Sequence, residues 1–337
     1  MKKDQLAVTS LAGFQWLFFM FANTIVIPIS IGAAFELQQI EVVSAIQRSF
    51  IFTGFACLLQ ALFGHRLALM EGQSGLWWGV ILSLAGTASA MGLSLATVGG
   101  SIAVGVIISG VLVAILGLLG MGEVLKKWFT PIVMFVFLLL LANQLITIFL
   151  KGMIGLIDGD TINPRLALFS FTLATITILI HTRGKGIVSS LNLLIGMTIG
   201  WIAAVYLFPE QATATIKTTP LLSWFPWGAP SLEWGIVITV IITGSLNTTN
   251  TIATLKGAED IYERKTTKRQ YKASFFITGI LSAVTGPLGL VPYAPYASSL
   301  GFLQSTGIKD RAPFIVGASL FILLGVVQEF SAFFFFF

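Results

Sequence analysis

The sequence is poor in the residues on which most enzyme and metal chemistry depends. Among 337 residues there is one cysteine, Cys57, and there are two histidines, His65 and His181. A single cysteine excludes a disulfide within the chain and any cysteine-based metal cluster. Paired-histidine metal spacing, the nucleophile elbow of hydrolases and the phosphate-binding glycine loop are missing as well. We therefore expect neither an enzyme nor a bound cofactor or metal.

Charged residues are also scarce, whereas apolar residues dominate the chain. Charged side chains make up 10% of it and hydrophobic ones 56%, while a soluble domain carries about 25% charged residues. A bilayer is spanned by ~20 mostly apolar residues per helix, and helices satisfy their own backbone hydrogen bonds in lipid. We expect an all-α polytopic membrane protein with about eleven spans, near residues 7–31, 43–63, 67–92, 99–121, 129–149, 166–182, 187–208, 235–255, 272–291, 292–307 and 313–337.

The formal charge of +5 is explained by membrane topology rather than by a nucleic-acid partner. With the N-terminus in the cytoplasm, most lysines and arginines fall in inner loops. Only Arg48, Lys151, Arg165 and Lys217 lie outside or near the outer surface. This distribution follows the positive-inside rule, and the tryptophans between residues 224 and 234 suit an outer interface. The pattern predicts a multi-pass protein of the cell membrane.

Two apolar stretches are interrupted by polar residues, at 69–79 ("LMEGQSGLWWG") and at 296–307 ("YASSLGFLQSTG"). Matching breaks in two halves of a chain are typical of inverted-repeat transporters, which bind substrate where the discontinuous segments meet. We expect residues 296–299 to run extended at mid-membrane, before a short half-helix over 301–307. The two breaks are then partners, with a ligand between them.

The same comparison divides the chain into two repeats. Residues 1–230 hold seven spans, and residues 231–337 hold spans eight to eleven of a second repeat, inverted because seven is an odd number. About three spans of a complete second repeat are missing, so we expect a truncated product or a fragment rather than a genuinely short protein. A non-transporting membrane protein is the alternative that this arithmetic leaves open.

Polar residues within the first break are candidate site residues. Glu71 is a carboxylate at membrane depth, which is costly and therefore points to function, although a place at the cytoplasmic interface near His65 would also explain it. Gln73 and Ser74 could contact a ligand, and Gly75 could let the backbone approach it closely. Trp77 and Trp78, which follow, could stack on a planar ligand or only pack.

Another set of polar residues lies in the eighth span. Helical spacing places on one face Thr243, Asn247, Asn250, Thr251 and Thr254. Hydroxyl side chains often only join helices, but two asparagines in seven residues favour a lined cavity. Gln15 could equally form a helix–helix hydrogen bond or contact the substrate, and Glu329 is a second intramembrane carboxylate of open role.

Several of these stretches together resemble the nucleobase–ascorbate transporter family, also called the nucleobase–cation symporter-2 family, which includes uracil and xanthine permeases. They are "GFQWLFFMFANTIVIPI" (13–29), "MEGQSGLWWG" (70–79) and "PYAPYASSLGFLQSTGIKDRAP" (292–313). The resemblance implies fourteen spans in two inverted seven-span repeats, arranged as core and gate domains, of which about eleven are present here. It also implies short β-strands in broken spans three and ten, with the base bound between them.

The resemblance also assigns substrate-binding positions, namely Gln15, Gln73, Ser74, Gly75, Ser298 and Ser299. The family glutamate that holds the base has no clear equivalent, and its place falls near Asn247 or Asn250. Trp16 replaces a family histidine, and serines replace an acid or amide at 298 and an asparagine at 299. These replacements make the site more neutral and roomier than is usual in the family.

The expected function is import of a nucleobase by alternating access, with a purine such as xanthine, guanine or hypoxanthine favoured over uracil. Coupling would use H⁺, with Glu71 or Glu329 as the titrating group, or Na⁺ held by carbonyl and hydroxyl oxygens. The expected partners are the nucleobase and the lipid bilayer, with a homodimer also allowed. A sulfate- or bicarbonate-type anion carrier of the same fold is the main alternative.

Overall fold

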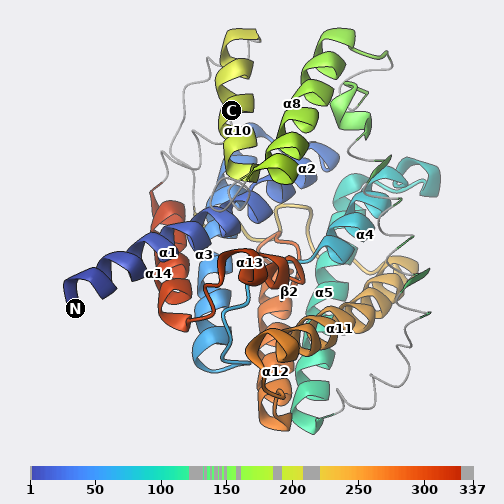
Figure 1. The fold of residues 1–337 in the computed structure, drawn as a ribbon. Coiled ribbons are helices and arrows are strands. Elements are labelled where there is room, and N and C mark those ends of the chain that lie inside the picture. Colours follow the sequence, from blue (N-terminus) through green and yellow to red (C-terminus); the bar gives the residue numbers. More distant parts are fainter. Residues whose placement is uncertain are drawn as a thin grey trace. The chain divides into compact units, whose positions relative to one another are not determined.

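The computed structural model describes residues 2–120, 150–156, 161–184, 192–207 and 221–327, with scattered positions between 132 and 147. The chain divides into two compact units (Figure 1). The smaller unit, Phe129–Ala214, contains α8 (Pro164–Arg183) and α10 (Asn192–Leu207), which pack against each other.

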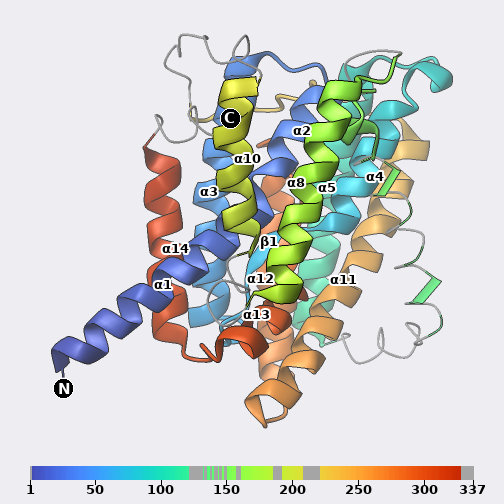
Figure 2. The same ribbon diagram turned by 45° about the horizontal axis from the view of Figure 1, so that its top comes forward.

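The larger unit joins residues Met1–Trp128 to Thr215–Phe336 and repeats one order of elements twice (Figure 2). Its first half contains α1 (Lys2–Thr24), α2 (Val26–Ala34), α3 (Gln39–Leu62), β1 (Glu71–Gln73), α4 (Gly75–Gly86), a 3-10 turn (Ser89–Met91) and α5 (Leu95–Leu119). Its second half contains α11 (Trp234–Tyr262), α12 (Lys268–Thr285), β2 (Tyr293–Pro295), α13 (Ser298–Thr306) and α14 (Arg311–Val326). Each half therefore has two long segments, a strand, a short helix and a further helix.

Five helical segments of the described chain are long and apolar enough to cross a membrane, which confirms a multi-pass membrane protein. They are Thr9–Ala34, Gln39–Leu62, Leu95–Leu119, Pro164–Arg183 and Trp234–Tyr262. The first is interrupted at Ile25, between α1 and α2. Pro28 explains the interruption, because a proline has no N–H to bond the Thr24 carbonyl four residues earlier.

The two broken segments meet, as the sequence pattern predicts. Strands β1 and β2 pair antiparallel, with Glu71 opposite Pro295 and Gln73 opposite Tyr293. The main chain continues the pairing at both ends, because Ser74 N–H donates to Pro292 O (2.8 Å) and Tyr296 N–H donates to Met70 O (2.8 Å). We call this two-stranded element the strand crossing.

The expected position of the second extended segment is wrong by several residues. The strand covers Tyr293–Pro295, whereas Ser298 and Ser299, expected in an extended segment, begin α13. The pairing ends at the hydrogen bond between Tyr296 and Met70. Beyond it the chain turns, with Ser299 N–H donating to Tyr296 O (3.0 Å), because an unpaired strand would leave its backbone groups unsatisfied.

The two halves pack against each other reciprocally. Helix α3 packs on α14 and α12 packs on α5, while α1 packs on α14 and α11 on α5. Glycines allow the α5–α12 pair to come close: a Cβ on Gly110 or on Gly279 would lie 2.7 Å from the carbonyl oxygen of the other. Small residues at such contacts are typical of membrane helices, which associate by close packing.

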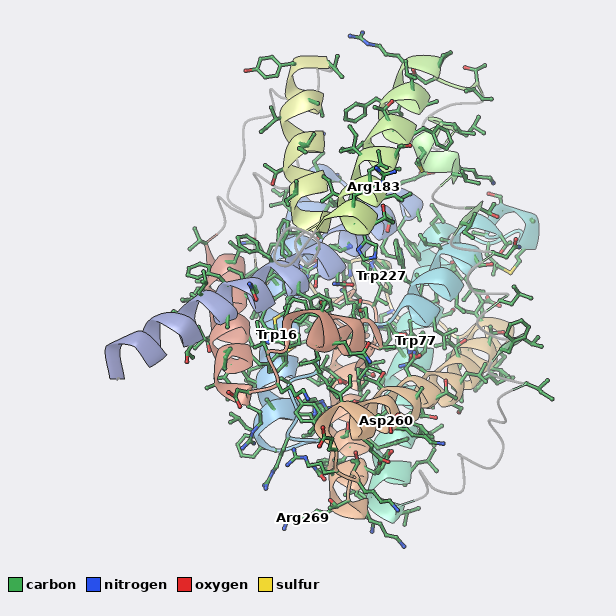
Figure 3. All side chains as sticks on the ribbon, viewed as in Figure 1. Trp16, Trp77, Arg183, Trp227, Asp260 and Arg269 are labelled. Carbon is green, nitrogen blue, oxygen red and sulfur yellow. The ribbon has the colours of Figure 1, made fainter. Side chains whose placement is uncertain are left out.

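Basic side chains join several chain segments at one end of this unit, which we call the basic end. Lys309 Nζ donates to Ile261 O (2.8 Å), and Arg311 Nη1 donates to Ala61 O (3.3 Å). The α11–α12 turn and the start of α1 point toward this same end in Figure 2. Trp227 stacks on Phe35 with ring centroids 5.4 Å apart, and Figure 3 shows it well away from Arg269 of α12.

Candidate functional site

Three of the expected site residues form one hydrogen-bonded group beside the strand crossing. Ser74 Oγ donates to Asn247 Oδ1 (2.6 Å), and Asn250 Nδ2 donates to the same oxygen (3.0 Å) and to Ser74 Oγ (3.4 Å). Ser74 precedes α4, and both asparagines come from successive turns of α11. The helical spacing that predicts a shared face for Asn247 and Asn250 therefore brings them to the first broken segment. We call these three residues the amide cluster.

Helix α11 also supports the second strand directly. Asn247 Nδ2 donates to Tyr293 O (2.9 Å), and Thr254 Oγ1 donates to Pro295 O (3.2 Å). Asn247 thus joins α11, β2 and the start of α4, and it is buried with 4% of its surface exposed. Its amide supplies a donor and an acceptor on two separate atoms, so that one side chain bonds to both segments.

The crossing has a more open side, formed by the starts of its two short helices. Gly75 begins α4, and a Cβ built there would meet nothing within 4 Å. Ser298 begins α13 and is exposed, and Asn250 is partly exposed. Helix N-termini carry partial positive charge and unpaired N–H groups. This side therefore combines backbone donors with the amide cluster, which suits a polar planar ligand.

The side chains of β1 point to the opposite, packed side. Successive strand residues alternate between faces, and Glu71 and Gln73 both face inward. Gln73 Nε2 donates to Ser49 Oγ of α3 (3.1 Å), while Glu71 Oε1 accepts from Thr278 Oγ1 of α12 (2.5 Å). Neither side chain lies with the amide cluster. The contact between Gln73 and substrate remains a prediction. The orientation of the Gln73 side chain toward Ser49 does not favour it.

Ser299 and Gln15 take different places from the amide cluster. Ser299 is fully buried, and its Oγ accepts from Met70 N–H (3.1 Å), so that it joins α13 to the segment before β1. Gln15 is partly buried on α1, and its side chain forms no hydrogen bond to a described residue. Glu329, the second coupling candidate, lies outside the described residues.

The tryptophans predicted either to stack on a ligand or to pack are both buried. Trp77 is 1% exposed and Trp78 is 7% exposed, and Trp78 Nε1 donates to Ser30 Oγ (2.8 Å). Trp16 is fully buried against Phe302, with ring centroids 4.4 Å apart. Figure 3 shows Trp16 and Trp77 on opposite sides of the centre of this unit.

A small polar cavity lies behind the amide cluster. Its volume is about 10 Å³, which is the size of a single water site. It lies among α4, α5, α11 and α12, and its lining residues are Trp77, Ser109, Val113, Gly244, Asn247, Thr248, Thr251, Thr278 and Ser282. Thr278, which donates to Glu71, and Asn247 therefore line the same cavity. A nucleobase is far too large for it in this conformation.

The sequence pattern did not single out two further residues. Arg48, expected at or near the outer surface, is 1% exposed within α3, and its Nη1 donates to Ser44 Oγ (2.5 Å). A charged residue inside an apolar stretch is itself a signal of function, so Arg48 could have been recognised from the sequence. Tyr296 Oη donates to the carbonyl of Gln73 and to that of Asn23 (3.3 Å), so that it joins the crossing to α1; no sequence signal indicates this contact.

Known proteins share both the sequence pattern and the architecture. Residues 7–336 match the model of a permease family, that of xanthine and uracil permeases. The chain is 30% identical to the putative purine permease YwdJ of Bacillus subtilis (strain 168), over 95% of this chain and 74% of that protein. The chain belongs to this permease family. The expected resemblance is thereby confirmed.

Other relatives agree with this membership. The permease is 26% identical to the xanthine permease and 23% identical to the uric acid permease PucK, both of Bacillus subtilis (strain 168). The alignments cover 95% of this chain in each case, with 72% of the first protein and 74% of the second. Among solved structures, it resembles the transmembrane domain of the cyanobacterial bicarbonate transporter BicA, with a TM-score of 0.70 and 14% identity. The match covers 98% of this chain and 87% of that domain. That likeness confirms the fold class.

Proposed function

We propose that this permease imports a nucleobase across the cell membrane by alternating access, with a purine preferred to uracil. The observation that carries the proposal is the amide cluster at the open side of the strand crossing. It lies where two broken spans meet, which is the usual substrate position in transporters built from inverted repeats. The relatives, which include purine, xanthine and uric acid permeases, support the same class of cargo.

The amide cluster has the chemistry to read the edge of a purine. An asparagine side chain offers two N–H donors and a carbonyl acceptor, and a purine edge presents both kinds of partner. Asn250 Nδ2 is engaged by Ser74 and Asn247. Its Oδ1 accepts from nothing among the described residues, so it is available to a ring N–H of the base. The N-terminus of α4 at Gly75 adds backbone donors for an exocyclic oxygen.

The small volume behind the cluster indicates how transport would proceed. A base that binds at the open side cannot pass through a cavity of about 10 Å³. The elements carrying the strand crossing must therefore move relative to the rest of the protein to expose the site alternately. The division into repeats at residues 1–230 and 231–337 and the arrangement as core and gate domains are part of this proposal. The reciprocal packing of α3 on α14 and α12 on α5 supports it.

We also propose how the chain is oriented in the membrane and that it forms a homodimer. The basic end would face the cytoplasm, following the positive-inside rule, with the N-terminus on the same side. Protease protection of an N-terminal tag in sealed, right-side-out vesicles tests this, because a tag on the cytoplasmic side is protected until the vesicles are opened. A homodimer is also proposed, and its test is the mass of the detergent-solubilised protein.

Uptake by cells that lack their own purine carriers tests the cargo. Labelled xanthine, guanine, hypoxanthine, uracil, sulfate and bicarbonate would be offered separately to cells making the chain. We expect uptake of at least one purine, competition by unlabelled purines, and loss of uptake in Asn247→Ala. Uptake of sulfate or bicarbonate alone would instead establish an anion carrier. No uptake of any of these by a correctly inserted chain would refute transport of the proposed cargo.

A further inference from the structure

Glu71 is surrounded by hydrogen-bonding groups on the packed side of the strand crossing. The side chain is fully buried. Its Oε1 accepts from Thr278 Oγ1 (2.5 Å), and Thr278 Oγ1 accepts in turn from Gln60 Nε2 (3.0 Å). Its Oε2 has no hydrogen-bond partner among the described residues. The carboxyl group is therefore held at one oxygen only, inside the membrane-spanning part of the protein.

The groups that face this carboxyl are neutral or weakly acidic. Helix α3 contributes Gln60 and Cys57, α12 contributes Thr278, and β2 contributes Tyr293, whose hydroxyl lies 3.1 Å from Thr53 Oγ1. No described lysine, arginine or histidine forms an ion pair with Glu71 or is among the groups that act on it. A buried carboxylate without a cationic side chain needs some other cation to neutralise it.

The surroundings of Glu71 reach the amide cluster through a shared cavity. Thr278, the donor to Glu71, also lines the one-water cavity, and Asn247 lines the same cavity from α11. Between them the cavity presents the hydroxyls of Ser109, Thr251 and Ser282. A threonine hydroxyl can rotate, so it can donate either to the carboxylate or into the cavity. The protonation of Glu71 therefore changes what Thr278 offers to the cavity that borders Asn247.

We propose that Glu71 is the site that carries the coupling proton, and that Thr278 and a water in the adjoining cavity transmit its protonation to Asn247. In the outward-facing state the carboxylate takes one H⁺ from the outer solution, and in the inward-facing state the acid returns that H⁺ to the cytoplasm. The neutral acid donates to Thr278, whose hydroxyl then turns into the cavity and orders the amide cluster for the base. This inference rests on the proposed nucleobase transport.

The experiment uses the purified full chain in sealed vesicles with a pH-sensitive dye inside. The purine that cells take up best is added outside. Two signals are recorded: exchange of labelled for unlabelled purine, which needs no net proton movement, and acidification of the lumen. We expect the unaltered chain to give both. Glu71→Gln, whose amide stands in for the neutral acid, should keep exchange and lose acidification.

Matched variants separate the relay from a packing effect. Thr278→Val, which keeps the shape and removes the hydroxyl that orders the amide cluster, should weaken exchange and acidification together, and Thr278→Ser, which retains a hydroxyl, should restore both. Glu233→Gln, an exposed carboxylate at the start of α11, should leave both signals unchanged. Infrared spectra at neutral pH add a readout that needs no substrate: the carbonyl band of a protonated acid should be present in the unaltered chain and lost in Glu71→Gln.

The outcomes are distinguishable. If the unaltered chain exchanges no purine, the proposed function fails, and the coupling role of Glu71 fails with it. If exchange occurs but Glu71→Gln still acidifies the lumen, only the proton site is overturned. If accumulation in the unaltered chain follows an imposed Na⁺ gradient and not a pH gradient, the coupling ion is sodium and the proton site is likewise overturned.

Discussion

Two contacts between a short helix and a long helix flank the strand crossing, and they correspond in the order of elements but differ in chemistry. On one side the first broken span meets α11 through the amide cluster, Ser74 with Asn247 and Asn250. On the other the second broken span meets α1 through rings, with Trp16 packed on Phe302 at 4.4 Å between centroids. We call these the amide side and the aromatic side. In the order of elements, α4 corresponds to α13 and α11 to α1.

The difference shows that a repeated fold does not require a symmetric site. On each side a short helix is held against a long helix by side-chain contacts. Rings achieve this by apolar contact alone, whereas amides leave donors and acceptors that a ligand can use. The rings of Phe302 and Phe314 around Trp16 are buried and carry no polar group, so we expect the aromatic side to provide structural support. Under the proposed function, substrate recognition is expected on the amide side.

The largest expected effect separates stability from transport. Trp16→Ala removes a fully buried ring that contacts Phe302 and Phe314, and a truncation of this kind costs about 3–5 kcal/mol of stability. Thermal unfolding of the detergent-solubilised protein measures it. The purine affinity of the chain that remains folded should change little. A large loss of affinity at unchanged unfolding temperature would show that the aromatic side also recognises substrate.

On the amide side we expect the opposite result, a larger effect on purine transport than on stability. Asn247→Ala leaves the Ser74 hydroxyl and the Tyr293 carbonyl without their partner, and each unsatisfied buried group costs about 1–3 kcal/mol. We expect a moderate fall in unfolding temperature and a loss of purine uptake. Thr239→Ala, which removes an exposed hydroxyl of α11 that donates to Gly235 O of the same helix, is the control and should retain most of the uptake.

Smaller changes in purine binding should distinguish the roles of two hydroxyls near the strand crossing, those of Tyr296 and Ser74. Tyr296→Phe removes the donor to the Gln73 and Asn23 carbonyls, and a single hydrogen bond contributes about 1 kcal/mol net. Ser74→Ala removes a hydroxyl from the amide cluster. Titration of purine binding should show weaker binding for Ser74→Ala and nearly unchanged binding for Tyr296→Phe. Equal losses would contradict the assignment of recognition to one side.

The architecture could be predicted from the sequence because polar residues that interrupt apolar stretches are easy to recognise. The segments around Gln73 and Ser298 stand out by composition, and their matching positions predict that they meet. The face shared by Asn247 and Asn250 follows from helical spacing, which the structure retains. Both features depend on residues close together in the chain, so they can be recognised in a single sequence.

The directions of individual side chains could not be predicted in the same way. Gln73 and Ser74 are neighbours, yet one points to Ser49 and the other to Asn247, because strand residues alternate and the register is set by pairing with β2. The place where β2 ends depends on the hydrogen bond between Tyr296 and Met70. Both depend on contacts between residues more than two hundred positions apart.

The smallest expected effect on folding is at Gly75, at the open end of the amide side. A Cβ there meets nothing within 4 Å, and alanine is preferred to glycine inside a helix by roughly 1 kcal/mol. Gly75→Ala should therefore fold at least as well as the unaltered chain. If the base lies against residue 75, the methyl group of the new alanine should nevertheless weaken purine binding.

The Gly75→Ala measurement is informative because its two readouts should move in opposite directions. Gly301→Ala is the matched control: Gly301 lies within the first turns of α13, and a Cβ there also meets nothing within 4 Å. That variant should raise stability in the same way and leave purine affinity unchanged. If both variants weakened binding equally, the base would contact both short helices, and the comparison between the two sides would have to be abandoned. An effect confined to Gly75 would locate the base against α4, beside Asn250.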